Sequence, residues 1–104
     1  MNRIALLLLL PPTLVSAQAF DLACIDKAGA SVSFSVDIDN RTVRVGPMPA
    51  KNIAIDSNYI NFTLSLNEGE WFHSINRSTG ILSIQGPRKE FVPPYICERA
   101  TKRF

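Results

Sequence analysis

The side chains that could support catalysis are few, and their spacing excludes the common active-site arrangements. His73 is the only histidine in this chain of 104 residues. The adjacent Ser74 cannot form a direct dyad with it on a strand, because successive side chains point to opposite faces, and no G-x-S-x-G motif occurs. Glu68 and Glu70 flank a turn glycine, where solvated hairpin charges are the ordinary explanation. The sequence therefore predicts a non-enzyme with no catalytic residue and a packed, structural His73.

Two cysteines, Cys24 and Cys97, lie far apart in the sequence. Two thiols and one imidazole cannot supply a zinc set, and no C-x-x-C spacing, phosphate loop or dinucleotide fingerprint occurs, so we expect no metal and no cofactor. In an exported chain an oxidising compartment favours pairing of the two thiols. We predict one disulfide that staples a domain whose core alone would give only marginal stability.

Aromatic and basic side chains concentrate between residues 71 and 94, and both types are enriched at binding hot spots. Two aromatic residues that are adjacent on a strand point to opposite faces, so at least one of them should be partly exposed. The alternative is that a sheet edge or a covering loop buries both. We predict a candidate binding surface made of Trp71, Phe72, Arg77, Arg88 and Phe91.

The elements that must position these side chains are predicted to be short β-strands. Two segments alternate apolar and polar residues with a period of two, which is typical of half-buried strands. In residues 31–39 the apolar face is Val32, Phe34, Val36 and Ile38, and in residues 59–66 it is Ile60, Phe62, Leu64 and Leu66. Shorter apolar-rich segments predict further strands at Phe20–Asp26, Thr42–Val45, Asn52–Asp56, Trp71–Asn76, Ile81–Gln85 and Tyr95–Glu98.

Turn residues separate these segments at close intervals, which favours hairpins. The proline-containing segments Gly46–Pro49 and Gly86–Pro94 should be loops or sheet edges, because proline donates no hydrogen bond to a ladder. The sequence therefore predicts an all-β domain, a small antiparallel sandwich or barrel of about eight short strands closed by one disulfide. Sandwich and barrel are equally compatible with this pattern.

The N-terminal residues have the pattern of a secretory signal peptide. A basic start is followed by an apolar run over residues 4–15 and a small-residue cleavage site ending at Ala19, with Ala17 as the alternative. The run is shorter than the roughly 20 residues of a spanning helix, so we expect no permanent membrane span. Lipidation of Cys24 is disfavoured, because Asp21 stands where a lipidation motif carries an apolar residue. We predict a signal peptide over 1–19, a β domain over 20–98 and a basic C-terminal tail over 99–104.

Residues 71–82 and the closing Tyr95-Ile96-Cys97 resemble a W-x3-I-x-R-x-T-G-x-L hairpin and Y-x-C ending of small, exported, uncharacterised proteins from Gram-negative bacteria and their phages. That resemblance implies a β fold and no activity. A weaker resemblance is to periplasmic inhibitors of c-type lysozyme, which are small disulfide-closed β-barrels. Their Ser-Gly-x-x-Tyr loop is replaced here by Ser57-Asn58-Tyr59, so no inhibitory residue carries over.

Charge and size narrow the range of partners. The formal net charge of +2 is too small to indicate nucleic acid or an anionic membrane. Sequons at Asn40, Asn61 and Asn76 fall at turn or outward strand positions that explain them without glycosylation, although a glycosylating host could modify them. We expect a monomeric, periplasmic or secreted, non-catalytic binding or interaction module for a protein or envelope partner of unknown identity. The alternative is an inhibitor of a host lysozyme-like enzyme.

Overall fold

The computed structural model describes residues 19–100, which form nine antiparallel β-strands and no helix. The strand order in the sheet is β4-β3-β2-β1-β9-β8-β7-β6-β5. The all-β prediction is thus confirmed, with one strand more than expected. The strands are β1 (Ala19–Asp26), β2 (Ser31–Asp37), β3 (Thr42–Val45), β4 (Met48–Pro49), β5 (Lys51–Ile55), β6 (Tyr59–Leu66), β7 (Gly69–Asn76), β8 (Ile81–Gln85) and β9 (Phe91–Arg99).

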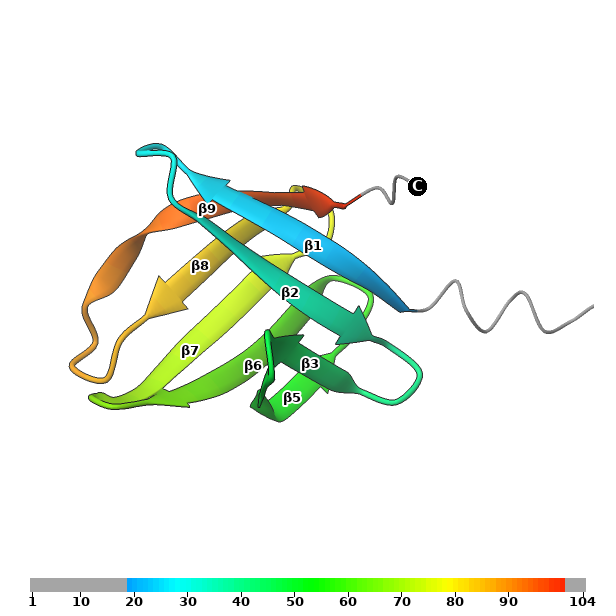
Figure 1. Ribbon diagram of the computed structural model, residues 1–104, viewed down its shortest axis with the longest axis horizontal. Helices are drawn as coiled ribbons and strands as arrows, with labels where there is room; N and C mark the ends of the chain where they lie inside the picture. The colour runs from blue at the N-terminus through cyan, green and yellow to red at the C-terminus, as the bar shows by residue number, and fades with distance from the viewer. Residues whose placement is uncertain (1–18, 101–104) are drawn as a thin grey trace, which may run out of the picture.

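The sheet curls into a nearly closed barrel (Figure 1). β4 pairs with β3 and β5 pairs with β6, so the chain that links β4 to β5 joins the two ends of the sheet. The linking residue is Ala50, whose backbone N–H donates to the carbonyl oxygen of Val43 at 2.8 Å. β3 and β5 also contact each other directly. Of the two architectures that the sequence left open, the structure shows the barrel.

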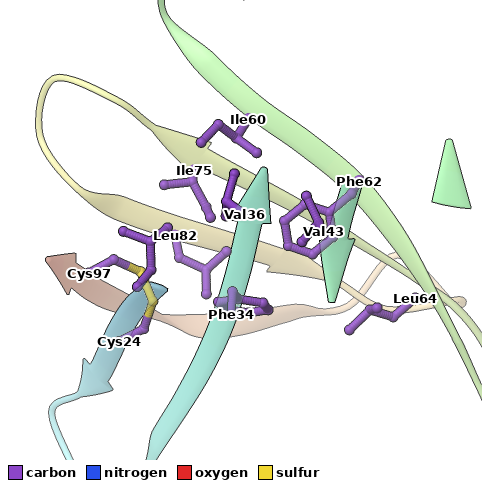
Figure 2. Close-up of a cluster of buried hydrophobic side chains, with 11 residues drawn as sticks. Cys24, Phe34, Val36, Val43, Ile60, Phe62, Leu64, Ile75, Leu82 and Cys97 are labelled. Carbon is purple, nitrogen blue, oxygen red and sulfur yellow. A yellow bond between two sulfur atoms is a disulfide. The ribbon is translucent and has the colours of Figure 1, made fainter. Parts of the chain in front are cut away.

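Apolar side chains from strands all around the barrel fill its interior (Figure 2). Phe34 and Phe62 meet edge to face at the centre, with ring centroids 5.4 Å apart. The predicted alternation is confirmed along β2 and β6, except at Leu66, which is exposed at the end of its strand. The fully buried core consists of Leu22, Cys24, Phe34, Val36, Val43, Ile60, Phe62, Leu64, Ile75, Leu82 and Cys97.

The prediction that residues 86–94 form a loop or an edge is wrong for the last four of them. Pro93 and Pro94 lie within β9, an interior strand of the sheet order. The pairing of β9 with β1 ends at Tyr95, and the register between β8 and β9 shifts where the two prolines together face Ser83. A β-bulge leaves a residue unpaired in the ladder, so it tolerates the missing N–H groups. Pro49 follows the prediction, because β4 is an edge strand.

The predicted disulfide joins Cys24 of β1 to Cys97 of β9, and the two residues are direct cross-strand partners. This bond is consistent with an oxidising, exported location. β9 continues through Arg99, one residue beyond the predicted domain end, and the guanidinium of Arg99 lies 4.0 Å from the ring centroid of Phe20. The described structure thus includes the first two residues assigned to the basic tail, and residues 101–104 of that tail lie outside the described part of the chain.

Of the predicted signal peptide, residues 1–18 lie outside the described part of the chain. β1 begins at Ala19. Cleavage after Ala17 would therefore leave β1 whole, whereas cleavage after Ala19 would remove its first residue. Within residues 19–100 no helix is long and apolar enough to cross a membrane.

Candidate binding site

The outward side chains of β6 to β9 form rows across one side of the barrel, where these four strands lie side by side (Figure 1). Antiparallel partners directly opposite each other bring their side chains into contact distance. One row contains two aromatic rings separated by an amide: Thr63, Phe72, Gln85 and Phe91. The next row is entirely polar: Asn61, Ser74 and Ser83.

An open hollow of about 480 Å³ lies over these rows. Phe72 and Phe91 line it and are 51% and 78% exposed, whereas Thr63 is only 3% exposed although it faces outward. Thr63 therefore lies deep in the hollow, and the two phenyl rings are open to solvent. The volume falls within the range of small-molecule sites, about 300–1,000 Å³.

The polar side chains that line the hollow are all neutral. They are the amides and hydroxyls of Asn52, Asn61, Thr63, Ser74, Ser83 and Gln85. No Lys, Arg, Asp or Glu is among the lining residues described. The lining also includes Phe62, His73 and Ile84, residues whose side chains pack toward the barrel interior. The hollow thus offers hydrogen bonds and apolar contact without a formal charge.

Two charges beside the hollow neutralise each other. Lys51 pairs in register with Thr63, and its ammonium group forms an ion pair with the carboxylate of Glu70 at 2.5 Å. The hydroxyl of Ser65 donates to the same carboxylate at 3.1 Å. The hydrogen bonds from Lys51 and then Ser65 lower the pKa of Glu70 below its ordinary value of 4.5. At neutral pH the pair adds no net charge to this side of the barrel.

β5 contributes Asn52 to the hollow through a β-bulge. The register between β5 and β6 shifts between Lys51 and Ala54, so that one extra residue lies on β5. Asn52 has a φ of 53°, a left-handed conformation that Asn adopts more readily than most residues. Bulges re-aim side chains, and this one accompanies the position of Asn52 among the residues that line the hollow.

His73 lies beneath the hollow, inside the barrel. Its ring stacks on Phe62 with centroids 4.9 Å apart and meets Phe34 edge-on at 6.0 Å. Nδ1 lies 3.0 Å from the carbonyl oxygen of Trp71, so Nδ1–H is the donor. Burial lowers the pKa of His73, and the hydrogen bond to Trp71 opposes that shift in part. The predicted packed position of His73 is confirmed, and its side chain is neutral at physiological pH.

Of the five residues predicted to form a binding surface, the structure brings Phe72 and Phe91 together. Trp71 is half-buried and shares the inward face of β7 with His73 and Ile75. Arg77 lies in the turn after β7, where its guanidinium donates to the carbonyl oxygen of Asp56. Arg88 is exposed in the turn between β8 and β9 and does not line the hollow.

Sequence reasoning missed the neutral polar partners of the two rings. The alternation in residues 59–66 places Asn61 and Thr63 opposite the apolar face of their strand, and Gln85 ends the predicted strand Ile81–Gln85. Only the register between four strands places these residues around the same hollow. The alternation of polar residues was the one signal in the sequence, and it carries no information on which strands are neighbours.

The segment Ser57-Asn58-Tyr59 forms a turn between β5 and β6. The carboxylate of Asp56 accepts hydrogen bonds from the backbone N–H groups of Asn58 and Tyr59 at 2.8 and 2.7 Å. These bonds lower the pKa of Asp56 below its ordinary value of 3.8. This geometry is an Asx turn that closes the hairpin between β5 and β6.

Residues 19–100 contain no cluster of three or more His, Cys, Asp or Glu side chains that could hold a metal ion. No protein family model, curated protein or solved structure matches the chain. The two resemblances drawn from the sequence stay predictions, and function has to be argued from the site itself.

Proposed function

We propose that this protein is an exported, non-catalytic binding module of the periplasm or the cell exterior, and that the hollow on β6 to β9 contacts its ligand. One observation carries the proposal: Phe72 and Phe91 expose their rings on the two sides of Gln85, above a neutral polar floor. Exposed apolar groups rimmed by polar residues mark interaction sites. Aromatic side chains also contribute a large share of contact energy where they become buried.

The chemistry of the hollow supports binding rather than catalysis. General acid–base catalysis needs a titratable side chain within reach of the substrate. Among the lining residues that the structure describes, His73 is the only titratable one, and its ring is stacked on Phe62 within the barrel. Ser74 and Ser83 supply hydroxyls, but no charged residue lines the hollow to activate them. What remains is recognition through apolar and hydrogen-bonding contacts.

Export is supported by two independent features. The first nineteen residues have the order of charge, apolar run and small-residue site that signal peptides share. The Cys24–Cys97 disulfide is stable in an oxidising compartment and rare in a reducing one. A binding function outside the cytoplasm fits both.

A capture experiment with matched variants tests the proposal. Tagged, oxidised mature protein is incubated with envelope extract, and bound molecules are compared between the parent, the double variant Phe72→Ser/Phe91→Ser and the control Ile25→Ser. Ile25 is 54% exposed on β1, comparable with Phe72, and does not line the hollow. We expect the double variant to lose capture and the control to keep it, with all three melting alike.

Equal capture by the double variant would remove the hollow as the contact surface. The same proteins are added to c-type lysozyme in a turbidity assay. A slowed enzyme would support the inhibitor alternative, and the two variants would show which surface is responsible.

A further inference from the structure

We infer that the ligand of this hollow is a neutral oligosaccharide, whose sugar rings stack on Phe72 and Phe91 while its hydroxyls bond to the surrounding amides and hydroxyls. This inference rests on the binding function proposed for the same face. It names the chemical class of the ligand.

The two phenyl rings suit the apolar faces of pyranose rings. Phe72 on β7 and Phe91 on β9 are separated by one strand, which carries Gln85 in the same row. Neighbouring strands lie roughly 4.8 Å apart, so the two ring positions are about 10 Å apart, about the length of a disaccharide. The face of an aromatic ring carries negative potential and attracts the polarised C–H groups of a sugar. Two adjacent sugar units can therefore each meet one ring.

The amides and hydroxyls that line the hollow can form hydrogen bonds with the hydroxyls of a saccharide. An amide side chain and a hydroxyl each donate and accept hydrogen bonds, as every sugar hydroxyl does. Gln85 lies between the two rings, where it can reach the link between two stacked sugars. Asn52, re-aimed by its bulge, and Ser83 lie among the other lining residues.

One buried acceptor on this face lacks a partner. Oδ1 of Asn61 is buried without a hydrogen-bond partner among the described residues, and the side chain faces outward beside Ser74. Buried polar atoms are nearly always paired, so an orphaned one calls for an explanation. Because Asn61 lines the hollow, a hydroxyl of a bound sugar can supply the donor after a small rotation of the amide.

The lack of charged side chains among the described lining residues favours a neutral saccharide over charged ligands. A nucleotide, an acidic glycan or an anionic lipid headgroup calls for cationic side chains. The lining residues include none, and Lys51 is engaged by Glu70. Protein interfaces favour Trp, Tyr and Arg as anchors, and here Trp71 and Arg77 turn away from the hollow.

Titration of the oxidised mature protein, followed by two-dimensional NMR of ¹⁵N-labelled amides, tests the inference. The probes are three neutral tetrasaccharides, cellotetraose, maltotetraose and N-acetylated chitotetraose, and one acidic probe, tetragalacturonate. We expect at least one neutral probe to shift the amide signals of Phe72, Gln85 and Phe91. Phe91→Ala should weaken that binding at least tenfold, Phe91→Tyr should keep it, and Ile25→Ala should leave it unchanged. Melting curves establish that each variant is folded.

The inference of a saccharide ligand is overturned if no neutral probe shifts these signals at millimolar concentration, or if the shifted signals belong to residues outside β7 to β9. Tighter binding of tetragalacturonate would overturn the neutral character of the ligand. If the saccharides fail while capture from extract still depends on Phe72 and Phe91, the binding function stands and the inference of a neutral saccharide is wrong. If both experiments fail, the hollow is not a binding site.

Discussion

At the level of single residues, the packing of His73 makes the stability of the fold depend on pH. The ring fills the barrel between Phe34 and Phe62, where a charged imidazolium would lose its hydration. The sequence predicted the packed, structural position of His73. It did not predict the aromatic neighbours, because the pairing of Phe62 with His73 depends on the register between β6 and β7, and Phe34 on β2 reaches His73 only across the closed barrel.

Acidification should therefore destabilise the fold through His73. Burial holds the pKa of His73 in the folded protein below its ordinary value of 6.5. Below that pH the unfolded chain binds a proton that the folded chain excludes, so the free energy of unfolding falls as the pH drops. The slope is at most about 1.4 kcal/mol per pH unit. Urea unfolding at about pH 7.5 and about pH 5 should show this loss in the parent and not in His73→Phe.

Two carboxylates titrate too low to confuse this measurement. Hydrogen bonds lower the pKa of Asp56 and Glu70 below their ordinary values of 3.8 and 4.5. Their contributions are present above those values and fade only at lower pH. If His73→Phe loses stability between pH 7.5 and 5 as steeply as the parent, the buried histidine is not the sensor.

At the level of elements, the alternation of apolar and polar residues predicted the strands but not the hollow that their outward side chains form. Phe91 has the same parity as Tyr95 and Cys97, so an uninterrupted β9 would turn it toward the interior. The extra residue at Pro93–Pro94 reverses that parity and places Phe91 opposite Gln85 on the outside. The sequence marked these prolines as incompatible with regular pairing, but where a bulge is accommodated depends on the partner strand. The hollow is therefore a product of register and bulges.

The turn between β7 and β8 depends on a glycine that touches β9. Gly80 has a φ of 80°, and a Cβ there would lie 2.5 Å from the carbonyl oxygen of Cys97. Cys97 also donates a hydrogen bond from its backbone N–H to the carbonyl oxygen of Gly80, at 2.7 Å. Gly46 has a similar φ of 60° with open space around its Cβ position. An alanine at Gly46 would meet only backbone strain, whereas an alanine at Gly80 would meet both backbone strain and a steric clash.

Gly80→Ala should destabilise the protein more than Gly46→Ala. Both changes force a left-handed alanine, which costs roughly 1–2 kcal/mol. Only Gly80→Ala must also push β9 away from the turn, so its total loss should be about 2–4 kcal/mol. Urea midpoints of the two variants measure the difference. Equal losses would show that β9 yields without cost.

At the level of the whole molecule, a disulfide ties the first strand to the last, and one short link joins the two ends of the sheet. Ala50 bridges β3 and β5 at one place, and Cys24–Cys97 joins the first strand to the last across 73 positions of sequence. The sequence predicted the disulfide because two cysteines in an exported chain leave only one pairing. It could not choose between sandwich and barrel, because that choice depends on whether the ends of the sheet meet.

Removing the disulfide should weaken the barrel strongly. Cys24→Ala/Cys97→Ala should lower the free energy of unfolding by about 2–4 kcal/mol, because the unfolded chain gains freedom when the staple is lost. Reduction of the parent with a thiol reagent should give a similar loss, and thiol titration of the oxidised parent should find no free sulfhydryl. Unchanged urea midpoints in the double variant and in the reduced parent would mean that strand pairing alone holds β1 and β9 together.

The pairing of Cys24 also bears on the predicted signal peptide. A lipid anchor would occupy the sulfur of Cys24, but that sulfur is bonded to Cys97 inside the barrel, where Cys24 is fully buried. Intact mass of the protein recovered from a bacterial periplasm should therefore show loss of the residues up to Ala17 or Ala19, no lipid, and two hydrogens fewer than the reduced chain. Cleavage after Ala17 would leave every residue of β1 in place, including the pairing of Ala19 with Asp37. A mass that retains Met1 would contradict cleavage of a signal peptide. A mass that carries acyl chains would place a lipid on Cys24 and leave Cys97 without its partner.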